Sequence, residues 1–374
     1  MKKFMAWCVT AVFVVVGLLP VMAHADTMPS TSSPNGDDMC ILPMLNGGTR
    51  TIRHDQLPNI YIPFRSDLKY YCPQSGGTGT VTFSRSGSAT YWDSAGTRQT
   101  AGSQVARFGY IYYDGAWVGP WLVREPAATN HVLNSAAPAT QTTGSLGTGI
   151  YTLWVEGSGS CAVAAGTATI TGAGTASSGT PVVFSVTVSG TVVLTVSGSP
   201  TLFQLENKPC PTSYIATTAA PATRNADSVS ITPANNVNVT TGTFLASVFL
   251  EASVPVASGT GSIHFIQFTG GTTTDAFYRN INLEPIRNHD STSTLSLSGN
   301  TWVVKPYKVA LTWGGAVRAI YNITDGLSTS GSFDGNLSTG TTLNLGYTGD
   351  MAGHYERDIY IFNRALSAAE VVTW

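Results

Sequence analysis

The sequence predicts an all-β fold, and three observations carry this prediction. Glycine is frequent, at 39 of 374 residues, while only 11% of the residues are charged. Short runs that alternate apolar and polar residues recur along the chain, as expected of strands that bury one face. Tight-turn pairs such as Asp114-Gly115 separate these runs. A composition rich in glycine, serine and threonine is typical of β-sandwiches with many short strands.

The first 25 residues have the pattern of a secretory signal. Lys2 and Lys3 precede an almost wholly apolar run over residues 4–22, and Ala23-His24-Ala25 places small residues before a cleavage point at Asp26. The alternative is a membrane anchor, but glycine and proline interrupt the run, which is near the short limit for a span. We therefore expect a secreted or extracellular protein, with no membrane span after cleavage.

The charge pattern argues against nucleic acid as the partner. The chain has 19 basic and 21 acidic residues, for a formal net charge of −2. Lysine and arginine form neither a cluster nor a stripe, which a protein that binds phosphate backbones needs.

Four cysteines follow the signal, at Cys40, Cys72, Cys161 and Cys210. In an exported chain they predict disulfide bonds, and four cysteines allow three pairings. We favour Cys40–Cys72 and Cys161–Cys210, because each pair closes a loop within one segment. The alternative, a zinc site, is disfavoured because these cysteines are far apart and no histidine lies at ligand spacing.

The strand pattern divides the chain into parts. We expect a leader and irregular N-terminal region at 26–80, a β-sandwich region at 81–215, a linker at 216–226 and a last domain at 227–374. Residues 60–64 form the one strand-like run before residue 81. Strands expected in the sandwich region are 81–83, 107–113, 116–124, 151–156, 182–188 and 191–196. The last two are joined by a tight hairpin at Ser189-Gly190, and Gly157 to Ser160 is interpreted as a simple turn.

The last domain combines strands with one helix. Its expected strands are 243–252, 262–268, 307–313, 317–323, 341–345 and 357–362. Residues 365–374 predict a helix, because Ser367 is a suitable N-cap and Glu370 three residues later completes a capping box.

Two segments of this domain resemble laminin-G-like jelly rolls of the concanavalin A-like lectin/glucanase fold. Asp358-Ile-Tyr-Ile-Phe-Asn-Arg-Ala-Leu-Ser-Ala-Ala-Glu-Val371 is similar to the closing strand and short helix of that fold. Tyr307-Lys-Val-Ala-Leu-Thr-Trp-Gly-Gly-Ala-Val-Arg-Ala-Ile-Tyr321 resembles its back-sheet hairpin. The resemblance implies a small β-sandwich followed by a concanavalin A-like jelly roll with a short C-terminal helix.

An upstream series of phrases resembles phage and prophage tail-fibre proteins. It consists of Thr82-Phe-Ser-Arg-Ser-Gly-Ser-Ala-Thr-Tyr91 with Asp93-Ser-Ala-Gly96, Gly119-Pro-Trp-Leu-Val-Arg-Glu-Pro-Ala-Ala-Thr-Asn130, Phe203-Gln-Leu-Glu-Asn207, Pro211-Thr-Ser-Tyr-Ile215 and Thr223-Arg-Asn-Ala-Asp227. Such proteins usually lack an export signal. The combination therefore implies a phage-like module on an exported adhesin, with a glycan or cell-surface polysaccharide as its partner and a homo-oligomer as a further possibility.

Aromatic residues are the candidate glycan ligands, because a flat ring stacks on the apolar face of a sugar. We select Trp92, Tyr113 and Trp117 upstream, and Trp302 and Tyr347 in the last domain. Tyr112 and Tyr113 are neighbours on one strand and must face opposite ways, so at least one lies outside the core. The alternative for each ring is core packing.

Calcium is the one cofactor that the resemblance suggests, since laminin-G-like domains sometimes hold it at the rim. Asp325, Asp334 and Asp350 fall in loops that would meet at one edge, and calcium requires oxygen ligands. The alternative is three solvated turn aspartates.

Catalysis is not expected. Glycoside hydrolysis usually needs two carboxylates in one cleft. The segment most similar to such a pair is Glu356-Arg357-Asp358, which we interpret as an exposed strand entry instead. We name no catalytic residue and expect non-catalytic recognition of carbohydrate or cell surfaces. A structural virion or fibre component remains the alternative, followed by an exported glycan-cleaving enzyme.

Overall fold

The computed structural model describes residues 39–43, 49–53, 56–72, 77–232, 237–250, 262–269, 275–280, 286–290, 293–300, 303–335, 337, 342–350 and 352–374. Strands make up most of this part of the chain, so the all-β prediction is confirmed. The expected secretory signal lies outside the described residues. Within them, no helix is long and apolar enough to cross a membrane.

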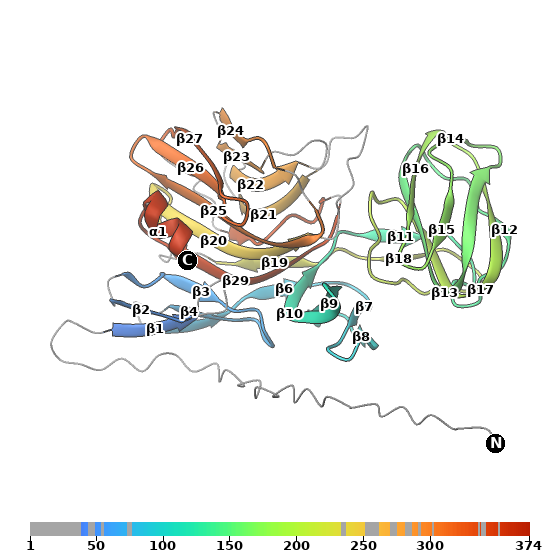
Figure 1. Cartoon of the computed structure of the whole chain (residues 1–374), viewed down its shortest axis with the longest axis horizontal. Coiled ribbons are helices and arrows are strands. Elements are labelled where there is room, and N and C mark those ends of the chain that lie inside the picture. Colours follow the sequence, from blue (N-terminus) through green and yellow to red (C-terminus); the bar gives the residue numbers. More distant parts are fainter. Residues whose placement is uncertain are drawn as a thin grey trace, which may run out of the picture.

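The larger lobe is a sandwich of two antiparallel sheets, which Figure 1 shows at the left. The first sheet has the order β27-β26-β25-β20-β29-β3-β4-β5, with β10 pairing β29 and β9 pairing β10. Its strands are β27 (Leu327–Ser332), β26 (Val317–Asn322), β25 (Lys305–Gly314), β20 (Thr241–Leu250), β29 (His354–Phe362), β3 (Ile60–Ile62), β4 (Lys69–Cys72), β5 (Gly77–Thr80), β10 (Ala116–Arg124) and β9 (Arg107–Tyr113).

The second sheet of this sandwich has the order β24-β23-β22-β21-β28-β19-β6. Its strands are β24 (Ser293–Leu297), β23 (Ile286–Asp290), β22 (Asp275–Asn280), β21 (Ser262–Thr269), β28 (Thr342–Asn344), β19 (Ser228–Ile231) and β6 (Thr82–Ser84).

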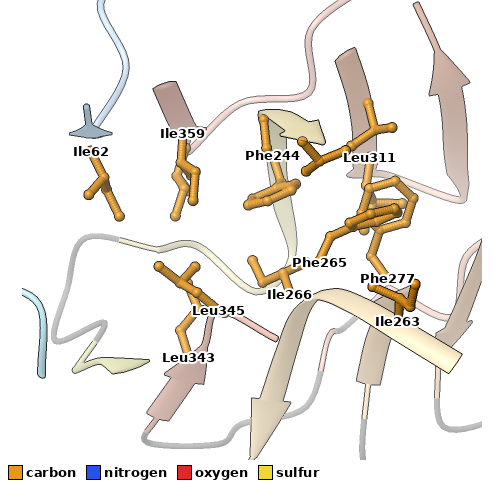
Figure 2. Packing of buried hydrophobic residues seen from close by; sticks show 14 of the residues in the cluster. Ile62, Phe244, Ile263, Phe265, Ile266, Phe277, Leu311, Leu343, Leu345 and Ile359 are labelled. Atoms are coloured by element: carbon orange, nitrogen blue, oxygen red, sulfur yellow. The ribbon is translucent and has the colours of Figure 1, made fainter. Parts of the chain in front are cut away.

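The main hydrophobic core lies between these two sheets. Figure 2 shows Phe244 and Ile359 of the first sheet facing Ile266 and Leu343 of the second, all almost fully buried. Removing this apolar surface from water, at roughly 25 cal/mol per Å², is the main force that holds the sheets together. This face-to-face arrangement makes the larger lobe a β-sandwich, in agreement with the predicted fold class.

The C-terminal helix α1 (Ala368–Thr373) forms as predicted. Ser367 accepts a hydrogen bond from the backbone N–H of Glu370, whose carboxylate accepts from the Ser367 backbone N–H in return. The helix ends on Trp374, whose ring packs against Tyr360 and Phe362 on the outer face of the first sheet.

The smaller lobe, residues 128–224, is built on a separate antiparallel sheet with the order β14-β16-β13-β17-β11-β18. In addition, β12 pairs with β17 and β15 pairs with β13. Its strands are β11 (Ala128–Asn130), β12 (Gln141–Thr142), β13 (Gly149–Ala165), β14 (Thr169–Thr171), β15 (Thr175–Ser177), β16 (Val182–Val188), β17 (Val192–Glu206) and β18 (Ala222–Arg224). Leu153, Phe184, Leu194 and Phe203 form the centre of its own core. Figure 1 shows it at the right, joined to the larger lobe through β11 and β18.

Two local predictions in this lobe were wrong. The strands β16 and β17 do not form a hairpin with each other, because both pair with β13, on opposite sides of it. The stretch from Gly157 to Ser160 is not a turn between strands but lies inside β13. Its register shift at Glu156/Gly157 and the positive φ of Gly157, at 93°, mark a β-bulge that bends one long strand.

The N-terminal region was expected to be irregular, and it is not. It contains the hairpin of β1 (Met39–Pro43) and β2 (Thr49–Arg53), and its strands β3, β4 and β5 extend the first sheet beside β29. The second sheet also includes β6, which lies upstream of the smaller lobe in the sequence and pairs with β19. The larger sandwich is therefore discontinuous in sequence and does not begin at residue 227. The stretch expected as a linker at 216–226 contributes β18, which pairs with β11.

Two hairpins lie next to the junction of the lobes. β7 (Ala89–Trp92) pairs with β8 (Arg98–Ala101), and β9 pairs with β10. The β9–β10 turn has φ of 50° at Asp114 and 80° at Gly115, as the two-residue turn predicted from Asp-Gly requires. Both strands have the predicted bounds.

Candidate functional site

A cleft of about 550 Å³ lies between the two hairpins and the smaller lobe. One wall comes from β7, β8, β9 and β10, and the other from β13, residues 177–181 and the segment 210–214. Its lining includes Thr90, Tyr91, Trp92, Arg98, Tyr110, Tyr112, Trp117, Trp154, Glu156, Ser177, Thr180, Ser213 and Tyr214. The cleft therefore gathers aromatic rings from segments more than a hundred residues apart.

Turn chemistry positions the first wall. Asp93 Oδ1 accepts hydrogen bonds from the backbone N–H groups of Ala95 and Thr97, both at 2.9 Å, which closes the β7–β8 turn. Gly96 in this turn has φ of 72°, and the indole of Trp117 packs so closely on it that a Cβ at this position would lie 2.4 Å from Trp117 Nε1. Glycine at position 96 thus lets the Trp117 ring lie against the turn.

Three rings form a platform on this wall, which we call the aromatic platform: Trp92, Tyr112 and Trp117. The Trp92 and Trp117 rings are 5.6 Å apart between centroids, and Tyr112 meets Trp117 edge-on at 5.5 Å. Tyr112 is 62% exposed, and both tryptophans are half-buried. These rings keep apolar surface open to solvent, as a stacking site for a ligand does.

Arg98 and Glu156 form an ion pair across the cleft, from β8 to β13. The Arg98 guanidinium also lies over the rings of Trp92, at 4.4 Å from the centroid, and Tyr214, at 5.1 Å. The side chains remain 22% and 31% exposed. The pair therefore links the hairpin wall to the smaller lobe while staying in contact with solvent.

The opposite wall is anchored by partly buried polar contacts. Ser213 donates to Glu125 from its backbone N–H and from its hydroxyl, both at 2.6 Å. The Tyr214 hydroxyl contacts Ser135 Oγ at 2.7 Å, and the Tyr214 carbonyl accepts from Thr90 Oγ1 at 3.0 Å. These bonds fix the 210–214 segment against both lobes.

A network of buried charges lies behind this wall. Arg107 bridges Glu125 and Asp227, Arg224 pairs with Glu125, and Arg85 pairs with Asp227 at 2.9 Å. All five side chains are at most 2% exposed. Burial acts to raise the pKa of Glu125, but the neighbouring Arg224 and Arg107 outweigh it and lower that pKa to about 2. Glu125 is thus a carboxylate at all ordinary pH values.

The phrases that resemble phage proteins supply much of this internal scaffold. Glu125, Arg224 and Asp227 belong to the charge network. Nearby, Glu206 accepts from the backbone N–H of Thr212 at 2.8 Å, and Gln204 accepts from that of Ile215 at 2.7 Å. These sequence segments therefore form the buried junction that holds the cleft, rather than its ligand-facing surface.

The five aromatic candidates have different positions. Trp92 and Trp117 line the cleft. Tyr113 faces inward, with its ring edge-on to Phe249 at 5.6 Å, while its neighbour Tyr112 faces the cleft, because adjacent strand residues alternate. Tyr347, 45% exposed, lies at a separate pocket of about 180 Å³ on the rim of the larger sandwich. Trp302 lies outside the described residues.

The three candidate calcium ligands do not come together. Asp350 is 1% exposed and pairs with Arg124 at 2.8 Å and His264 at 2.6 Å, and Asp325 pairs with Lys305 at 2.6 Å. Asp334 is exposed, two residues after the end of β27. In the described part of the chain, no three acidic, histidine or cysteine side chains form a group that could hold a metal ion. The expected set is wrong, since internal cations already pair with two of its members.

The cysteine pairing is also corrected in part. Cys161 is a free, buried cysteine in the core of the smaller lobe, and burial raises its thiol pKa to about 11. Cys210 belongs to the core of the larger sandwich, so the expected Cys161–Cys210 bond is not formed. The side chain of Cys40 lies outside the described part, and its pairing with the buried Cys72 stays a prediction.

Glu356 and Asp358 are not at an exposed strand entry, as had been expected. Both are at most 2% exposed. Glu356 binds His354 Nε2 at 2.6 Å, whereas Asp358 binds Arg65 at 2.9 Å and Tyr61 at 3.2 Å. The positive φ of Asp358, at 51°, accompanies a register shift in this strand, so the two acids serve different internal contacts.

No family model matches this sequence, and no curated protein matches it. Among solved structures, the chain is similar to Trypanosoma rangeli sialidase in complex with the inhibitor DANA, at 18% identity and a TM-score of 0.28, over 36% of this chain and 22% of that one. It is also similar to a binding domain of botulinum neurotoxin DC in complex with SialylT, at 13% identity and a TM-score of 0.33, over 40% and 38%.

A botulinum neurotoxin type C structure, whose description concerns cell entry through two ganglioside molecules, matches at 13% identity and a TM-score of 0.33, over 40% of this chain and 39% of that one. The chain thus spans about a fifth to two fifths of the structures it matches. Likeness this partial assigns no function to the cleft.

Proposed function

We propose that the cleft binds carbohydrate, and that the protein is an exported, phage-like adhesin that recognises glycans without cleaving them. The observation that carries the proposal is the aromatic platform of Trp92, Tyr112 and Trp117, which is open to solvent in a cleft of about 550 Å³. A cleft of this size accommodates a few sugar rings.

The chemistry of the cleft suits a sugar on both its faces. Indole and phenol rings stack on the C–H face of a pyranose, and this contact removes apolar surface of both partners from water. Ser177 and Thr180 line the same cleft, and their hydroxyl groups are suited to hydrogen bonds with the sugar edge. A platform with hydroxyls at its border is therefore a better fit to a glycan than to a purely apolar ligand.

Binding without hydrolysis is the proposed outcome. The usual glycoside hydrolase mechanism needs two carboxylates on either side of the scissile bond. Among the described residues that line the cleft, Glu156 is the one carboxylate, and it is paired with Arg98. We expect incubation with bound oligosaccharides to release no smaller sugars, as measured by chromatography.

The test of glycan binding is a glycan array with the exported chain and two variants. Trp117→Ala is expected to weaken binding by about 2 kcal/mol, roughly 30-fold, because it removes the central ring of the aromatic platform. Tyr347→Ala is the matched control, since it removes an exposed ring outside the cleft.

Circular dichroism must show that both variants are folded. Equal loss in both variants, or binding that survives in folded Trp117→Ala, would contradict the proposed site. A well-folded wild-type chain that binds nothing across a broad array would favour a structural fibre component instead. Export is tested separately by N-terminal sequencing of the secreted chain, which is expected to begin at Asp26.

A further inference from the structure

We infer that the cleft selects neutral over acidic glycans, and that Glu156 sets this selectivity by occupying the charge of Arg98. The inference rests on the proposed function and goes further, because it names the class of ligand and the residue that determines it.

The charge balance of the cleft is the first step. Among the described residues that line it, Arg98 and Glu156 are the two that carry a formal charge at neutral pH, and they are of opposite sign. The remaining lining consists of Cys210 and of aromatic, aliphatic, hydroxyl and backbone groups. The cleft is thus neutral as a whole.

The second step is that the charge of Arg98 is already paired with an internal carboxylate. Its guanidinium lies over the rings of Trp92 and Tyr214, and its Nη2 donates to Glu156 Oε1. A sugar carboxylate or sulfate at the remaining N–H groups of Arg98 would lie beside the Glu156 carboxylate and be repelled by it, and one that displaced Glu156 would leave that carboxylate unpaired. Removing a charge from water without a partner is costly, so an acidic group is disfavoured at this position.

The third step concerns the cations behind the wall. Arg107 and Arg224 lie under Ser213, but both are at most 1% exposed and both bind Glu125. They are occupied by internal partners and do not reach the cleft surface. Among the described residues that line the cleft, Arg98 is therefore the one cation, and Glu156 balances its charge.

The experiment uses an array that prints each neutral glycan beside its sialylated, uronic or sulfated counterpart. The wild-type chain is expected to bind neutral members at least ten-fold more tightly than acidic ones, with little change between 50 mM and 500 mM NaCl, since no charged contact to the ligand is made. Equal or tighter binding of acidic members would overturn the inference and leave glycan binding intact. No binding to any member would instead count against the proposed function itself.

Glu156→Gln supplies the decisive variant. Glutamine keeps the shape of the side chain and can still accept from Arg98, but the net charge of the cleft becomes positive. We expect the ratio of acidic-glycan to neutral-glycan affinity to rise at least ten-fold, and binding of the acidic members to become salt-sensitive.

Asp67→Asn is the control, because it makes the same charge change in a surface ion pair with Lys69 that does not line the cleft. It is expected to leave both classes unchanged. A ratio of acidic-glycan to neutral-glycan affinity that stays at the wild-type value in folded Glu156→Gln would show that Arg98 does not govern selectivity. A rise of the same size in Asp67→Asn would show an effect of overall charge and also contradict the inference.

Discussion

At the rim of the larger sandwich, Arg124, His264 and Asp350 are buried and bonded to one another, whereas in the cleft Trp92, Tyr112 and Trp117 keep part of their rings open to solvent. The rim pocket is about 180 Å³ and the cleft about 550 Å³. Polar groups that satisfy one another stabilise the fold and leave little capacity for a ligand. Polar and aromatic side chains therefore indicate a binding site only where they keep hydrogen-bonding groups or ring surface that no other part of the protein contacts.

Loss of a charge at the rim should lower the stability of the protein and leave glycan binding at the cleft nearly unchanged. Asp350→Asn leaves Arg124 buried without its carboxylate, so we expect the free energy of unfolding to fall by about 3–5 kcal/mol. Glycan affinity of the protein that remains folded should change less than three-fold. Urea denaturation and glycan binding measured on the same sample test both parts.

Asp325→Asn is the matched control for this variant. It breaks the Lys305 pair, whose side chains are 26% and 22% exposed, and is expected to cost about 0–1 kcal/mol because solvent screens the pair. A loss of glycan binding in folded Asp350→Asn would place the ligand at the rim and reverse the comparison.

A substitution at Gly96 disturbs the aromatic platform without replacing any of its rings. In Gly96→Ala the new Cβ would meet the Trp117 indole, in addition to the cost of φ at 72°, which is about 1–2 kcal/mol for a residue with a side chain. We expect this loss of unfolding free energy together with at least ten-fold weaker glycan binding.

Gly87→Ala separates these two effects. Gly87 has φ of 83°, and no atom lies within 4 Å of its added Cβ. It is expected to lose similar stability and to bind glycan normally. Equal weakening of binding in both variants would mean that general destabilisation, and not the position of Trp117, controls affinity.

Local sequence signals predicted local structure well. The hairpin of β9 and β10 and the capped helix α1 depend on Asp114-Gly115 and on Ser367 with Glu370, which act within a few residues. The β3 strand was predicted only as an isolated run, because its pairing with β29 joins residues about three hundred positions apart. Nothing in the local pattern of residues 60–62 indicates that partner.

The cleft was predicted only in part for the same reason. Density of aromatic residues singled out Trp92 and Trp117, but the choice between Tyr112 and Tyr113 depends on which strand face meets Phe249. Arg98 and Glu156 were missed, since 58 residues separate them and neither belongs to a motif. Cys161 and Cys210 were paired on sequence spacing, although they belong to two different cores.

Acid should weaken the rim before it affects the cleft. Burial and the nearby Arg124 lower the pKa of His354, which lies among Arg124, Glu356 and Asp350. Below about pH 6.5 the unfolded chain therefore binds a proton that the folded chain does not, and stability falls as pH falls, by at most about 1.4 kcal/mol per pH unit. The pKa of Glu125 is about 2 in the folded chain and near 4.5 in the unfolded chain. Its contribution to stability is therefore complete until the pH falls below about 4.5.

Urea denaturation of wild type and His354→Gln at pH 7, 6 and 5 measures this difference. The wild type is expected to lose stability over this range, and the variant to lose less, since it removes the titrating group. Glycan affinity of the folded wild type should stay constant from pH 7 to pH 5, because Glu125 still holds Ser213 through its ionised carboxylate. Affinity that falls over this range while the protein stays folded would show that the junction behind the cleft titrates with the rim, and that the two regions are not independent.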